Sequence, residues 1–72
     1  MCEASVYLLR DGDEQLLLED VCLIRPDEQA GGLLLRNIFG EQRVIRGAIC
    51  RADLARHRII VAPSPDGAKA AV

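Results

Sequence analysis

Aromatic residues are almost missing from this 72-residue chain, which contains no Trp and only Tyr7 and Phe39 as aromatic side chains. A core must therefore be built from Leu, Ile, Val and Ala. The shortage of aromatic rings also removes the platforms on which single-stranded nucleic acids commonly stack. The length allows one small domain, because it leaves no room for a cofactor domain beside a catalytic one.

Neither sign of charge dominates, and long apolar runs are missing. The 9 Lys and Arg residues oppose 11 Asp and Glu residues, which gives a formal net charge of −2. This balance does not favour a nucleic acid held by bulk electrostatics. No apolar run approaches the roughly 20 residues that cross a bilayer as a helix, so we expect no membrane partner.

Cysteine is sparse and lacks the spacing of a disulfide framework. Cys2, Cys22 and Cys50 are far apart, and the chain has neither a CxxC motif nor a signal-peptide pattern. These features predict a cytoplasmic, reducing location. Cys22 and Cys50 lie in apolar runs and are expected to pack as small buried hydrophobic residues. A metal or a second subunit must then supplement the small core.

Short apolar runs between turn residues predict strands. The first run ends at Asp11-Gly12, a pair typical of a hairpin turn, and the polar pair Glu19-Asp20 predicts a bend or bulge in the second. The expected strands are 4–10, 15–25, 33–39, 42–52 with a kink at Gly47, and 58–62, with one helical turn allowed near Leu54. We therefore predict an all-β fold, a small antiparallel barrel-like domain of five or slightly more strands over residues 1–62, followed by a flexible C-terminal tail over 63–72.

Apolar side chains occur on both faces of the expected strands. In the first strand Val6 and Leu8 point to one face, whereas Tyr7 and Leu9 point to the other. One face can line the core of a small barrel, and the other must be covered by something else. A second copy of the chain is the simplest way to bury the outer apolar side chains, so we predict a homodimer.

The sequence offers little for catalysis. His57 is the single histidine, and a nucleophilic pair of His57 with Cys22 or Cys50 has no local signature. The glycines lack the spacing of a phosphate-binding loop. We therefore expect a protein that is not an enzyme.

Cys2 is a candidate metal ligand because of its position. If Met1 is removed, Cys2 offers a thiolate and an α-amine that close a five-membered chelate ring. Two subunits that meet near their N-termini would supply two nitrogen and two sulfur donors, a set that suits Ni(II) or Cu(II) and can also hold Zn(II). If Met1 stays, the thiolate would act with the backbone amide of Cys2 or Glu3. His57 is a weaker candidate, and an N-terminal cysteine without any metal role is the alternative.

The arginines of the expected third and fourth strands suggest an alternative function in RNA binding. Four arginines fall on the expected third and fourth strands: Arg36, Arg43, Arg46 and Arg51. They allow a small-barrel RNA-binding protein as the alternative function. Solvated strand faces balanced by glutamates explain the same residues, and we favour that interpretation over nucleic-acid binding.

Several segments resemble the CooT family of small proteins, named for an accessory protein of carbon monoxide dehydrogenase. They are Met1-Cys2-Glu3-Ala4, Val6-Tyr7-Leu8, residues 17–21 (LLEDV), residues 35–41 (LRNIFGE) and residues 57–60 (HRII). The resemblance implies a cytoplasmic, homodimeric, β-rich protein that binds nickel through Cys2 at the dimer interface. It also implies a metallochaperone or accessory role in the maturation of a nickel enzyme such as carbon monoxide dehydrogenase. No family role transfers to Cys22 or Cys50.

Overall fold

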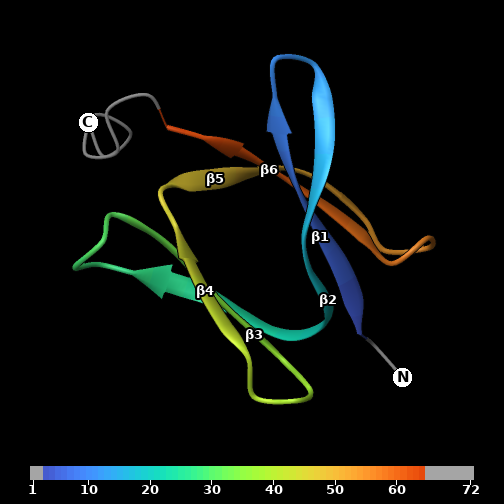
Figure 1. Cartoon of the computed structure of the whole chain (residues 1–72), viewed down its shortest axis with the longest axis horizontal. Helices are drawn as coiled ribbons and strands as arrows, with labels where there is room; N and C mark the ends of the chain where they lie inside the picture. Colours follow the sequence, from blue (N-terminus) through green and yellow to red (C-terminus); the bar gives the residue numbers. More distant parts are fainter. Residues whose placement is uncertain (1–2, 65–72) are drawn as a thin grey trace.

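The computed structural model describes residues 3–64, which form one six-stranded sheet. The strands are β1 (Ala4–Arg10), β2 (Asp13–Asp27), β3 (Gly32–Asn37), β4 (Gln42–Ile45), β5 (Gly47–Asp53) and β6 (Arg58–Pro63). Their order across the sheet is β4-β3-β2-β1-β6-β5, and the sheet curls into a half-barrel (Figure 1). The prediction of an all-β, barrel-like fold is confirmed.

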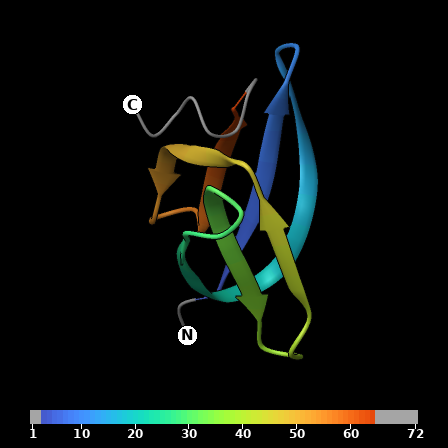
Figure 2. The same ribbon diagram turned by 90° about the vertical axis from the view of Figure 1, so that its left-hand side faces the viewer.

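The β1–β2 hairpin forms where the sequence predicts it. Asp11 and Gly12 have φ angles of 55° and 84°, as the tight turn between two twisted strands requires. The long hairpin that results projects beyond the other strands (Figure 2). Further along β2, Asp20 has a φ of 56° and the pairing with β1 shifts register between Val21 and Leu18. This irregularity confirms the predicted bulge at Glu19-Asp20.

The long fourth run of the sequence forms two strands. A bend at Arg46 separates β4 from β5, and the chain passes directly from one edge of the sheet to the other (Figure 1). A Cβ atom on Gly47 would collide with the carbonyl oxygen of Ala62. Glycine therefore permits the close approach to β6, which accounts for the predicted kink. Residues 54–57 form a turn without a helix.

The central pairing differs from the antiparallel pattern that we predicted. β1 and β6 run parallel, in a register from Ser5 opposite Arg58 to Leu8 opposite Val61. The β1–β2, β2–β3, β3–β4 and β5–β6 pairings are antiparallel. The difference arises because β1 and β6 come from opposite ends of the described chain, where no hairpin turn determines the strand direction.

The core is aliphatic, as the composition predicts. Val6, Leu35 and Val61, from β1, β3 and β6, have the largest fully buried side chains. Along β1 the buried residues alternate with half-buried ones, so the second face of this strand is only partly covered. Asn37 is the buried polar residue of the segment 3–64. Within this segment no helix has the length and apolar character needed to cross a membrane.

Candidate metal centre

The candidate ligand Cys2 lies outside the described residues, and so does Met1. The described chain begins at Glu3, and Ala4 opens β1 as a buried residue. Two residues of extended chain span at most about 7 Å. The surroundings of Ala4 therefore define what a site built on Cys2 could reach.

The start of β1 is fixed by the turn between β5 and β6. The backbone N–H of Ser5 donates a 2.8 Å hydrogen bond to the carbonyl oxygen of His57. The turn has internal bonds of its own, because the Asp53 carboxylate accepts the N–H of Arg56 at 3.2 Å. His57 closes it with a φ of 57°, a left-handed conformation that is uncommon for a residue with a side chain. The lower-priority candidate His57 thus lies beside the first strand.

An apolar cavity of about 270 Å³ adjoins this point. Its lining residues come from β1, β2, the β5–β6 turn and β6: Ala4, Val21, Cys22, Leu23, Ile24, Leu54, His57 and Ile59. Leu54 has 73% of its surface exposed. One cysteine and the single histidine therefore border the same cavity as the first residue of β1, although they are far apart in the sequence.

The expectation that Cys22 and Cys50 are buried is wrong, because both thiols are exposed. The bulge at Asp20 places Val21 in the core, so that Cys22 falls on the outer face. The Cys22 thiol lies 3.7 Å from the carbonyl oxygen of Arg36, a weak contact. Cys50 lies on β5, an edge strand whose residues are mostly exposed.

Residues 3–64 contain no group of three or more His, Cys, Asp and Glu side chains that could hold a metal ion. Cys22 and His57 are two donor-type side chains at one cavity, and stable sites usually use four donors. A complete ligand set at this end of the molecule therefore needs a donor from beyond this segment or from a second copy of the chain.

The four arginines of the RNA-binding interpretation do not form one patch. Arg36 pairs with Gln42, whose side-chain oxygen accepts two hydrogen bonds from the guanidinium at 3.1 and 2.7 Å. Arg43 is the next residue along β4, so its side chain leaves the opposite face of the sheet. Arg46 lies at the bend, and Arg51 lies on β5 at the other edge.

Comparison with known proteins identifies the family. The family model for CO dehydrogenase accessory protein CooT matches residues 1–62. The structure is also similar to a crystal structure from Carboxydothermus hydrogenoformans that carries a provisional CooT assignment, with a TM-score of 0.80 and 43% sequence identity over 88% of this chain and 98% of that chain. No curated protein matches. The chain belongs to the CooT family of CO dehydrogenase accessory proteins.

Proposed function

We propose that this protein binds Ni(II) through Cys2 and acts in the cytoplasm as a metallochaperone or accessory factor, without catalysing a reaction itself. Its client is a nickel enzyme, and carbon monoxide dehydrogenase is the candidate that the family description suggests. The observation that carries the proposal is the match to this family over residues 1–62, a range that includes Cys2. The same donors can hold Zn(II) or Cu(II) in vitro.

The donor groups of an N-terminal cysteine are suited to Ni(II). After removal of Met1, the thiolate and α-amine of Cys2 would form a chelate that needs no other part of the fold. A free α-amine has a reference pKa of about 7.7–8.0 and a thiol one of about 8.5, so Ni(II) displaces protons from both near neutrality. Nickel affinity should fall as the pH is lowered, because the thiolate and the amine become protonated. If Met1 is retained, the Glu3 backbone amide becomes the second donor.

Two copies of the chain would share one ion, which requires a homodimer whose symmetry axis passes near the start of β1. The apolar cavity beside Ala4 supports this placement, because Leu23 and Leu54 at its border are large and exposed. A two-fold contact there would cover both leucines and bring the two first strands together. His57 would then lie near the shared ion, as an additional donor of lower priority than Cys2.

Calorimetric titration of Ni(II) at neutral pH tests the proposal with single-residue variants. Cys2→Ser should lower the affinity at least about 100-fold, because it removes the sulfur donor. Cys22→Ser and Cys50→Ala serve as matched controls and should bind nickel within a few-fold of the wild type. A Cys2→Ser protein that binds Ni(II) as tightly as the wild type would refute the site.

A further inference from the structure

The turn between β3 and β4 displays a large apolar side chain to solvent. Phe39, the single Phe of the chain, has 73% of its surface exposed, and its neighbour Ile38 has 51% exposed. The ring is not part of the buried core, so core packing does not account for this residue. Exposed aromatic side chains of this kind are typical anchors of protein–protein contacts.

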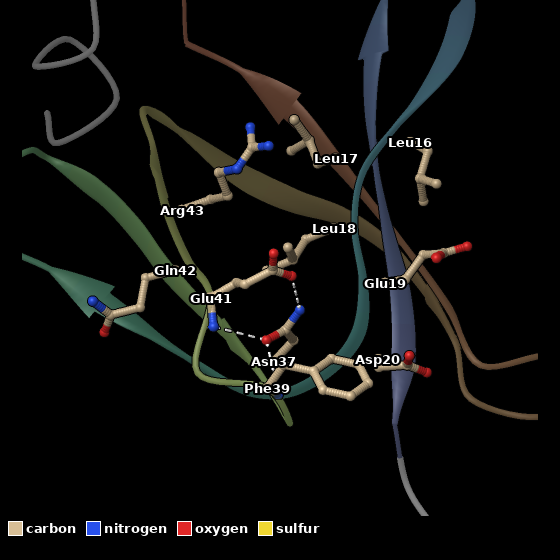
Figure 3. A pocket seen from close by; sticks show the side chains of 10 residues that line it. All are labelled: Leu16, Leu17, Leu18, Glu19, Asp20, Asn37, Phe39, Glu41, Gln42 and Arg43. Atoms are coloured by element: carbon tan, nitrogen blue, oxygen red, sulfur yellow. Dashed lines mark hydrogen bonds between the residues drawn. The ribbon is translucent and has the colours of Figure 1, made fainter.

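Asn37 holds this turn in one conformation. It is only 3% exposed, and its amide oxygen accepts the backbone N–H groups of Phe39 at 3.0 Å and Glu41 at 2.9 Å (Figure 3). Its amide nitrogen donates to the Glu41 carboxylate at 2.7 Å. The backbone N–H of Ile38 adds a 3.0 Å bond to the carbonyl oxygen of Asp20. Phe39 is therefore presented from a rigid base, which reduces the entropy lost when a partner binds.

A cavity of about 600 Å³ opens beside Phe39. Its wall combines aliphatic side chains of β2 with three carboxylates, those of Glu19, Asp20 and Glu41 (Figure 3). Glu41 is bonded to Asn37, whereas Glu19 and Asp20 take part in neither of the ion pairs within residues 3–64. The one basic side chain in the wall, Arg43, lies at the end of the cavity away from Phe39 (Figure 3).

We propose that this surface, formed by Leu16, Glu19, Asp20, Phe39 and Glu41, docks a segment of a partner protein that carries a Lys or Arg beside an apolar side chain. The apolar side chain would pack on Phe39, and the cation would meet the carboxylates of Glu19 and Asp20. The excess of negative charge disfavours a nucleic acid at this surface. The inference goes beyond nickel binding, because it requires neither Cys2 nor a metal.

A second copy of the chain fits this surface less well than a different protein. One exposed segment within residues 3–64 that combines a basic and an apolar side chain is the β5–β6 turn, which contains Leu54 and Arg56. Docking this turn on the Phe39 surface of another copy would join two different patches. In the dimer proposed above, the other copy already covers Leu54, so this turn would not be available to the Phe39 surface of another copy.

Selection of displayed random 12-residue peptides against the full chain in chelator-treated buffer tests the proposal. The enriched peptides should carry Lys or Arg next to an apolar residue, and a labelled peptide made from one of them should bind in fluorescence anisotropy. Phe39→Ala should weaken this binding roughly 10-fold or more. The double variant Glu19→Gln/Asp20→Asn should weaken it about 3- to 10-fold and reduce its dependence on salt.

Matched controls separate docking from general effects. Ile49→Ala is the control for Phe39→Ala, because it removes an exposed apolar side chain on β5. Asp11→Asn/Glu28→Gln is the control for the double variant, because it removes two exposed carboxylates. Asp11, like Asp20, has a positive φ. Both controls should bind the peptide within about twofold of the wild type. The proposal would be overturned by enriched peptides without basic residues, by an absence of enrichment, or by unchanged binding in the Phe39→Ala protein. Concentration-dependent polymers that Phe39→Ala abolishes would also overturn it, since the surface would then bind a second copy.

Discussion

The backbone N–H of Ser5 donates a hydrogen bond to the carbonyl oxygen of His57, with 2.8 Å between nitrogen and oxygen. This bond uses the main chain of His57 and leaves its imidazole out. A substitution at residue 57 can therefore remove the imidazole and still keep the hydrogen bond from Ser5 to the backbone carbonyl. Glycine is the suitable replacement, because the φ of His57 is 57°.

We expect His57→Gly to keep nickel affinity within about threefold, because we propose Cys2 as the principal ligand and His57 as a secondary candidate. Its free energy of unfolding should equal that of the wild type or exceed it by up to about 1 kcal/mol, because glycine relieves the left-handed strain. Calorimetry and urea denaturation measure the two quantities. A loss of nickel affinity beyond tenfold in a stably folded His57→Gly protein would make the imidazole a principal ligand.

Leu54→Asp should convert the proposed dimer to a monomer at micromolar concentration, because a charge would be placed in the proposed apolar contact beside the first strand. Sedimentation velocity measures the change. Ile49→Asp is the control, since Ile49 is also exposed but lies on β5 away from this cavity. Dissociation by Ile49→Asp and not by Leu54→Asp would place the dimer contact on β5 instead.

Asn37→Ala should lower the free energy of unfolding by about 1–3 kcal/mol, because it removes the acceptor of the Phe39 and Glu41 N–H groups in a partly buried turn. Urea denaturation at one fixed protein concentration measures this. Gln42→Ala, which removes an exposed amide next to the same turn, should change the value by less than about 0.5 kcal/mol. Equal effects of the two substitutions would contradict a special role for the Asn37 amide.

The structure also bears on nucleic-acid binding. Arg36 and Arg43 leave opposite faces of the sheet, so they cannot line one binding track. We expect no gel shift of a labelled single-stranded RNA at micromolar protein and low salt, where contacts to phosphate are strongest. A shift that disappears steeply with added salt, and that Arg36→Gln weakens, would support the alternative function.

Local features of the fold could be predicted from the sequence, whereas long-range ones could not. Asp11-Gly12 marks the hairpin and Glu19-Asp20 marks the bulge, because turn and bulge geometry depend on a few adjacent residues. The parallel β1–β6 pair depends on how the sheet closes, which no local signal encodes. The exposed position of Cys22 follows from the number of residues in the bulge, which the sequence alone did not reveal. One extra residue in the bulge reverses which side chains face the core.

The candidate metal site also combines a feature that the sequence suggests with contacts that depend on the whole fold. Cys2 is proposed as a ligand from its place in the chain and from the family pattern, and it lies outside the described residues. The position of His57 and Cys22 at one cavity near the start of β1 depends on strand pairing across the whole domain. The exposed turn at Phe39, where we propose a docking surface, could not be predicted from the sequence either. The sequence predicts a strand over residues 33–39, whereas β3 ends at Asn37 and Phe39 lies in the turn that the buried Asn37 amide holds.

Native mass spectrometry of the nickel-loaded protein, produced without a tag at its N-terminus, tests whether two chains share one ion through Cys2. We expect a complex of two chains with one Ni(II) ion, both chains lacking Met1, and loss of the ion in the Cys2→Ser protein. One ion on each single chain, or a two-chain complex that keeps its ion after Cys2→Ser, would contradict it.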